Sequence, residues 1–266
     1  QDVTRIFDTD PDSTPAAEDA PPQIRRIRHE LRRRSLTVAD TVQLSPHMIR
    51  LTLTGADLAD FVSLGADDHL KVILPQAGPE EARRDYTPRR FDPAHHELVL
   101  DFVDHPGGPA ADFARDLRVG DSVTVAGPRG SAVVEGDIAH WLLIGDETAL
   151  PAIGRRIEDL PAGTAVTSLV AVPGTADEQA LTTAADWRGI WVHRPLSAAA
   201  DPAPLLAALA GIDLPARCYV WLAAEAGVAR ALRDALLARG HPKAWMKASG
   251  YWTAGRADAS DKTLDG

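Results

Sequence analysis

Residues 84–90, RDYTPRR, group side chains that could bind a charged ligand carrying a flat ring. Arginine guanidinium groups bind phosphate and carboxylate oxygens through paired hydrogen bonds. The tyrosine ring could lie against a flat ring, and the threonine hydroxyl could bond a ring nitrogen. Pro88 restrains Thr87 to an extended backbone, which fixes where that hydroxyl points. The cluster therefore indicates a small anionic ligand with a ring, and the alternative is a charged turn at a sheet edge.

A second candidate anion site lies in residues 105–117, HPGGPAADFARDL. Gly107 and Gly108 form a loop, and Pro109 suits the first position of a helix, where its missing N–H costs nothing. The N-terminus of this helix would offer free backbone N–H groups and the positive end of the helix dipole. One such loop alone is weak evidence. Together with the arginine cluster it indicates a pyrophosphate site.

The elements that position both candidate sites are predicted to be β-strands. Short runs of alternating character continue from Leu36 to Val134, with turn residues between them. We expect two strands in 36–55 around Ser45-Pro46, single strands in 69–75 and 97–105, and two strands in 121–134 around a Gly-Pro-Arg-Gly turn. Several short strands with regular turns favour a closed or nearly closed antiparallel barrel.

After residue 137 the pattern changes to strands that alternate with helices. Strands are expected in 140–148, 164–174, 189–195 and 217–227, and helices in 149–161, 204–212 and 228–240, while 243–255 closes the core. This alternation predicts a parallel sheet covered on both faces. Ligands of such sheets bind at the carboxyl ends of the strands, which here carry GDET, AVPG and AAEAG. The sequence has no G-x-G-x-x-G, so a nicotinamide nucleotide would bind without that loop.

The domain organisation that we predict has four parts. Residues 1–23 form a flexible tail, because they are rich in Asp, Pro, Ala and Thr. Residues 24–136 form the barrel domain, residues 137–256 the α/β domain, and residues 257–266 a second flexible tail. The arginine-rich run IRRIRHELRRRS at 24–35 is compatible with a helix or with a basic strand.

Composition excludes several classes of protein. The 266 residues carry a net charge of −10, which disfavours a general nucleic-acid binder because such proteins need a basic surface. The single cysteine, Cys218, rules out an internal disulfide and a thiolate cluster, and we expect no resident metal. No apolar run approaches the roughly 20 residues of a membrane helix, and no signal peptide is evident. We therefore expect a cytoplasmic monomer without stable membrane association.

Six motifs together resemble a known family. In order they are RDYTPR, DFVDHPGGPAADFA, GDSVTVAGPRGS, LLIGDETALPAI, WLAAEAGVARALR and KASGYWTAG. With these spacings the chain resembles the siderophore-interacting proteins, flavin-dependent ferric-siderophore reductases of the ferredoxin-reductase-like superfamily, over roughly residues 30–256. The resemblance implies an N-terminal antiparallel FAD-binding β-barrel and a doubly wound parallel α/β domain that can receive NADH or NADPH. Ferredoxin remains open as the electron donor.

The resemblance also implies residues that contact the flavin. Arg84 would contact its phosphate side, Tyr86 and Thr87 would hold the isoalloxazine, and Arg89 would lie at the same site. The remaining residues implied for the ribityl chain, the phosphates and the adjoining turn are Asp101, Val103, His105, Gly108, Ala110, Ala111, Pro128, Gly130 and Ser131. For His105 alone, a loop histidine without a ligand is the stronger reading.

On the α/β side, the resemblance implies that Asp146, Glu147 and Thr148 face the nicotinamide and that Trp252 lies close to the flavin. The two carboxylates could instead be helix-start residues favoured by the dipole. One branch of the family carries a lysine in the region of Lys247 and uses it for the substrate. We therefore assign Lys247 to an anionic ferric chelate, with a surface lysine as the alternative.

The implied reaction is release of iron from a ferric siderophore, with a hydroxamate slightly favoured. A flavin can deliver single electrons, and hard oxygen chelators hold Fe(II) far more weakly than Fe(III). Two alternatives remain. One is a diaphorase-like electron-transfer protein with a protein acceptor, and the other is a siderophore-binding module without turnover. Flavin absorption would exclude the binding module, and rates with ferric chelates against protein acceptors separate the other two.

Overall fold

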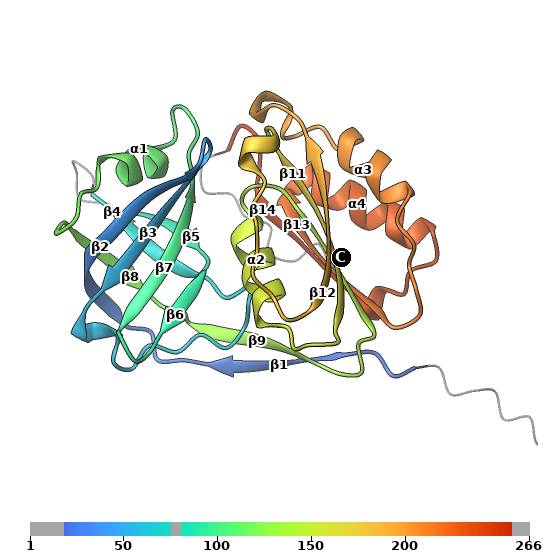
Figure 1. Ribbon diagram of the computed structural model, residues 1–266, viewed down its shortest axis with the longest axis horizontal. Helices are drawn as coiled ribbons and strands as arrows, with labels where there is room; N and C mark the ends of the chain where they lie inside the picture. The colour runs from blue at the N-terminus through green and yellow to red at the C-terminus, as the bar shows by residue number, and fades with distance from the viewer. Residues whose placement is uncertain (1–18, 76–80, 257–266) are drawn as a thin grey trace, which may run out of the picture.

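The computed structural model describes residues 19–75 and 81–256. Of the predicted tails, residues 1–18 and 257–266 lie outside these ranges, and Gln23 begins strand β1 (Gln23–Arg28). Figure 1 shows a β domain beside an α/β domain. None of the helices in the described ranges is long and apolar enough to cross a bilayer.

The β domain is an antiparallel sheet of seven strands in the order β5-β4-β8-β2-β3-β7-β6. Alternate side chains enter its core, as in β4, where Leu70, Val72 and Leu74 are buried. The sheet curls until β5 lies near β7, which gives the nearly closed barrel that the sequence predicts. The strands are β2 (Arg33–Ser45), β3 (Met48–Thr54), β4 (Leu70–Leu74), β5 (Ala82–Tyr86), β6 (Arg90–Asp92), β7 (Glu97–Val103) and β8 (Ser122–Ala126).

The arginine-rich run at 24–35 forms strands and not a helix. Strand β1 pairs antiparallel with β9 (Gly130–Glu135), from Gln23 opposite Glu135 to Arg28 opposite Gly130. The two strands run beneath both domains in Figure 1. Backbone pairing with β9 decides the conformation here, because most side chains of β1 are exposed and bury little surface.

The α/β domain has five parallel strands in the order β12-β11-β10-β13-β14. Helix α2 (Leu150–Asp159) packs on one face, and α3 (Ala203–Ala210) and α4 (Ala226–Ala238) pack on the other. This confirms the doubly wound fold. The strands are β10 (His140–Gly145), β11 (Ala165–Val172), β12 (Asp186–His193), β13 (Cys218–Glu225) and β14 (Met246–Trp252).

Polar contacts fix the two domains against each other. Arg89, only 2% exposed, reaches from the barrel to Glu158 of α2, with 2.6 Å between Nη1 and Oε2. Arg155 of the same helix donates to the Ser63 hydroxyl at 2.8 Å and to the carbonyl of Pro88 at 3.0 Å. The strand end that carries Tyr86 and Thr87 is therefore anchored to the α/β domain.

Candidate functional site

The arginine cluster lies on β5, at the edge of the barrel sheet. Tyr86 is directly opposite Leu70 of β4, and Arg84 is opposite Val72. The Tyr86 ring packs on Phe102, with 4.0 Å between ring centroids, and burial raises the pKa of its phenol. Because side chains two apart share a face, the half-buried Arg84 lies on the same face as Tyr86.

The glycine loop leads into helix α1 (Pro109–Asp116), as predicted. Gly108 is the N-cap residue, and no side chain caps the helix, so the first-turn N–H groups face outward for a ligand. A Cβ at Gly108 would come within 2.3 Å of the His105 ring, and Gly107 has a positive φ of 76°. Ala110 packs on the same barrel core as Tyr86. The predicted ring and phosphate sites therefore border the same barrel core.

These residues fit FAD. The uncapped helix N-terminus and Arg84 supply donors for two phosphates, and Tyr86 supplies an aromatic face. Thr87 follows directly at the strand end and is 8% exposed. Ala111 is buried in the first turn of α1, where only its backbone N–H can reach a ligand. The fit of FAD therefore rests on hydrogen-bond donors of Arg84 and of the α1 backbone and on the ring of Tyr86.

Three other residues assigned to the flavin have partners within the protein. Asp101 receives two hydrogen bonds from Arg50, at 2.8 and 2.9 Å, which leaves its backbone for any ligand contact. Arg89 is turned toward α2, and a Cβ at Gly154 would lie 2.9 Å from its Nη2 atom. The Ser131 hydroxyl lies 2.5 Å from Asp68 and 2.7 Å from His29. Their roles at the flavin stay predictions.

The last two of the assigned residues on this side lie on the connection into α1. Val103 ends β7 opposite Met48 and is half-buried. His105 is exposed in the loop, and its Nδ1 atom lies 3.4 Å from the carbonyl oxygen of Pro106. The position of His105 against Gly108 makes it a neighbour of the phosphate-binding turn.

From β10 the chain adds β11 and β12 on one side and β13 and β14 on the other, so the order of the sheet reverses between β10 and β13. Carboxylate side chains lie at this switch point. Asp146, 1% exposed, accepts hydrogen bonds from the backbone and hydroxyl of Thr148 at 2.9 and 2.5 Å. Its other oxygen accepts from the Glu225 backbone at 3.1 Å and from the Trp252 indole at 2.9 Å. The structure thus brings Trp252 to Asp146 and Thr148, although Trp252 lies 106 residues after Asp146 in the sequence.

Two further acidic residues lie near the same switch point. Glu225 caps helix α4 by accepting from the backbone of Val228 at 3.0 Å. Glu147 and Arg194 form a buried pair, with 2.8 Å between Oε2 and Nη2. Burial raises the pKa of Glu147, and the hydrogen bonds from Arg194 only partly oppose it.

Lys247 is not a free surface cation in this structure. Its Nζ atom lies 2.5 Å from the Asp67 carboxylate of the barrel, and the Trp221 indole donates to the same oxygen at 3.2 Å. Burial raises the pKa of Asp67, but Lys247, Trp221 and Arg156 together lower it, and the net shift of the pKa is downward. Sequence reasoning missed Asp67, whose only signal was an acidic pair, Asp67-Asp68, ahead of a predicted strand.

The contact between Trp252 and Asp146 predicts a stability effect. Trp252→Phe removes one donor from a buried carboxylate, so we expect the free energy of unfolding to fall by about 1–3 kcal/mol. Urea unfolding measures this change. Trp191→Phe is the control, since its indole N–H has no hydrogen-bond partner within residues 19–75 and 81–256. Equal losses in both variants would show that the Asp146 contact contributes nothing of its own.

Comparisons with known proteins agree on one family. Residues 138–255 match the siderophore-interacting protein family, and residues 37–83 and 78–132 match the siderophore-interacting FAD-binding domain. The chain is similar to the NADPH-dependent ferric-chelate reductase of Escherichia coli (strain K12), with 35% identity over 251 residues that cover 86% of this chain and 96% of the relative.

Two solved structures are similar over most of their length. A siderophore utilization protein from T. fusca has a TM-score of 0.83 and 32% identity, covering 90% of this chain and 99% of the other. The siderophore-interacting protein SipS from Aeromonas hydrophila has a TM-score of 0.74 and 30% identity, covering 85% and 94%.

Proposed function

The chain belongs to the siderophore-interacting protein family, and on this basis we propose that it is an FAD-dependent ferric-siderophore reductase. Its barrel is an FAD-binding domain. The observation that carries the proposal is that Arg84 and Tyr86 of β5 and the uncapped N-terminus of α1 border one barrel core, where together they suit a dinucleotide with a flat ring.

The protein's own part in the reaction is to bind and orient. Arg84 and the first turn of α1 would hold the phosphates, and Tyr86 with Thr87 would hold the ring. When bound, FAD supplies the chemistry, taking a hydride from a nicotinamide and passing electrons singly to iron. Reduction to Fe(II) loosens a hard oxygen chelator, so no bond of the chelator is broken and no iron ligand from the protein is required.

The proposal also names the electron donor and the class of siderophore. The Escherichia coli relative is named NADPH-dependent, which supports NADPH as the donor. We favour a hydroxamate as the siderophore. The cleft between barrel and sheet is built from a single chain, which supports a monomer, and a nicotinamide donor supports a cytoplasmic location.

An anaerobic reoxidation experiment tests the function. The purified full chain, reduced at its flavin, is mixed with ferric hydroxamate or ferric catecholate siderophores, and flavin absorbance is followed. We expect rapid reoxidation by at least one chelate class. A protein that carries no flavin would support a binding module. Fast reoxidation by protein acceptors alone would support the diaphorase-like alternative.

We expect that removal of the Lys247 charge slows the reduction of anionic chelates. Lys247→Ala would leave Asp67 buried without its cation, so we choose the double variant Lys247→Met with Asp67→Asn, which removes both charges. If Lys247 attracts the chelate when the pair opens, reoxidation by an anionic chelate should slow by about tenfold at low salt. The loss should shrink at high salt, because exposed charges are screened within about 10 Å at 0.1 M.

Two controls accompany this variant. Asp67→Asn alone keeps the lysine and should retain the rate with anionic chelates. Lys243→Ala removes a cation from the same segment of the chain and should leave the rate within twofold of the parent. If the double variant reduces anionic and neutral chelates as fast as the parent, Lys247 acts only as a contact between the domains.

A further inference from the structure

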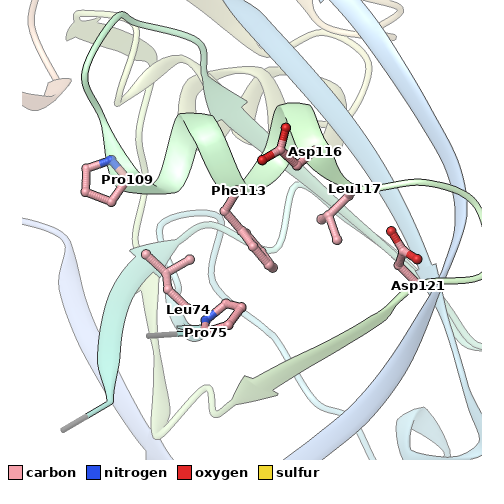
Figure 2. A pocket seen from close by; sticks show the side chains of 7 residues that line it. All are labelled: Leu74, Pro75, Pro109, Phe113, Asp116, Leu117 and Asp121. Carbon is pink, nitrogen blue, oxygen red and sulfur yellow. The ribbon is translucent and has the colours of Figure 1, made fainter. Parts of the chain in front are cut away.

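A small cavity between the barrel and the α/β domain holds charged groups that the proposed function has not yet used. It has a volume of about 10 Å³, space for about one water molecule. Figure 2 shows a different pocket, in which Phe113 of α1 points toward Leu74 and Pro75, and the two share no lining residue. The interdomain cavity is lined by Ala66, Asp67, Leu143, Ala152, Arg156 and Trp221.

The Asp67 carboxylate at this cavity uses only one of its two oxygens. Its Oδ2 atom lies 2.5 Å from Nζ of Lys247 and accepts a hydrogen bond from the Trp221 indole at 3.2 Å. Lys247 and Trp221 are directly opposite each other on β14 and β13, so both donors converge on the same atom. No hydrogen bond reaches Oδ1 within the part of the chain that the structure describes. This oxygen can therefore accept a further donor.

Arg156 of α2 supplies such a donor to the same cavity. Its guanidinium lies over the Trp141 ring, with 4.7 Å from Cζ to the ring centroid. Among the described residues, no oxygen accepts a hydrogen bond from it. Burial lowers the pKa of Arg156, and the carboxylates of Asp67 and Asp159 only partly oppose this. A half-buried guanidinium without an acceptor thus shares a cavity with a carboxylate that has a free oxygen.

An exchange of partners would release Lys247 without leaving a buried charge unpaired. The Asp67 side chain is 12% exposed, so loss of Lys247 with no replacement would be strongly unfavourable. If Oδ1 of Asp67 turns toward Arg156, the carboxylate exchanges an ammonium for a guanidinium and stays paired. The interdomain cavity gives the carboxylate space for this turn.

We propose that Arg156 is a positioning residue for the substrate, which takes over Asp67 and thereby frees Lys247 for an anionic ferric chelate. This inference rests on the proposed function, because it takes Lys247 as the contact of the chelate. An anionic chelate favours the exchanged arrangement, since it meets a free ammonium only there. A neutral chelate gains nothing from the released charge. The exchange therefore makes the protein respond to the net charge of its substrate.

The test compares two chelates that differ only in charge. The probes are linear tris-hydroxamates whose terminal amine is either succinylated, which gives an anionic ferric complex, or acetylated, which gives a neutral one. In Arg156→Met, Asp67 keeps Lys247 as its nearest cation. Reoxidation of the reduced flavin by the anionic complex should therefore slow about tenfold, within the range of coupling between residues that share a partner. The rate with the neutral complex should stay within about twofold of the parent.

A second substitution separates the exchange from a folding defect. In Asp67→Asn with Arg156→Met, Lys247 no longer faces a carboxylate, so the anionic rate should return to within about twofold of Asp67→Asn alone. Any packing defect caused by Met at position 156 would persist in this double variant. Arg156→Lys keeps a cation at the cavity and should recover most of the rate. Arg188→Met removes an exposed arginine of β12, outside the cavity, and should leave both rates unchanged.

Binding without turnover gives an independent measurement. The redox-inert gallium(III) complexes of the same two chelators are titrated into the oxidised full chain and followed by calorimetry. Arg156→Met should weaken the anionic complex about tenfold and the neutral one less than twofold. Equal effects on both complexes, no effect, or a double variant as impaired as Arg156→Met overturns the exchange. If the parent binds the gallium complexes but reduces neither ferric complex, the proposed function fails, and the binding measurements still decide the role of Arg156.

Discussion

Arg89→Ala should lower the free energy of unfolding by about 3 kcal/mol, at the lower end of the range for breaking a buried ion pair. The guanidinium is 2% exposed and is bonded to Glu158 of α2 at 2.6 Å, while Asp101 lies 3.8 Å from its Nε atom. The substitution leaves both carboxylates with fewer cations. Arg50 still binds Asp101 and Arg90 still lies 3.7 Å from Glu158, which keeps the loss moderate.

This loss should appear as a melting temperature lower by roughly 6–12 °C, given about 2–4 °C per kcal/mol for chains of this size. Arg90→Ala is the matched control, since the neighbouring arginine is exposed and contributes little to Glu158. A paired replacement, Arg89→Met with Glu158→Leu, should recover most of the stability, because it leaves no unpaired charge at α2. A melting temperature for Arg89→Ala within 2 °C of the parent would contradict the role of Arg89 between the domains.

The role of Arg89 shows where sequence reasoning ends. The resemblance assigns Arg89 to the flavin, since it follows RDYTP directly. Its side chain lies in the domain interface, where it bonds Glu158 and Gly154 leaves room for it, and its contact with the flavin stays a prediction. Neighbouring residues of an extended segment point to opposite faces. The partner of Arg89 on its own face is set by the packing of α2 on the barrel, which the local sequence does not specify.

Local patterns sufficed for the elements themselves. Alternating residues predicted β4 and β8, and continuous apolar runs flanked by turn residues predicted β10, β11 and β13. The Gly-Gly-Pro sequence predicted the start of α1. The run at 24–35 could not be decided, because its conformation depends on β9, which lies about a hundred residues away.

The site could be predicted only where its residues are close in sequence. Arg84, Tyr86 and Thr87 form one short segment, so their types and spacing were informative. Lys247 and Asp67 come from different domains, and Trp252 and Asp146 lie at the ends of two different strands of one sheet. Nothing in the local sequence of either partner specifies the other: Asp67 was not singled out, and Asp146 was assigned to the nicotinamide side with no link to Trp252.

Arg84→Ala should weaken flavin binding by about 10- to 150-fold. A charge-assisted hydrogen bond contributes roughly 1.5–3 kcal/mol, and each 1.4 kcal/mol is a factor of ten in the dissociation constant. Arg84 shares one face of β5 with Tyr86, two residues away, so its charge would meet the phosphate nearest the flavin ring. Since that phosphate is present in both cofactors, FAD and FMN should be weakened by similar factors.

Arg83→Ala is the control, because the adjacent arginine lies on the opposite face of β5 and pairs with Glu81. Arg84→Lys should recover only part of the affinity, since an ammonium keeps the charge but loses the paired geometry of the guanidinium. The measurements are flavin retention on dilution and titration of the flavin-free chain. Full retention of FAD by Arg84→Ala would contradict a phosphate contact of Arg84 and leave the α1 backbone as the phosphate site. An equal loss of affinity in Arg83→Ala would show that the effect is not specific to Arg84.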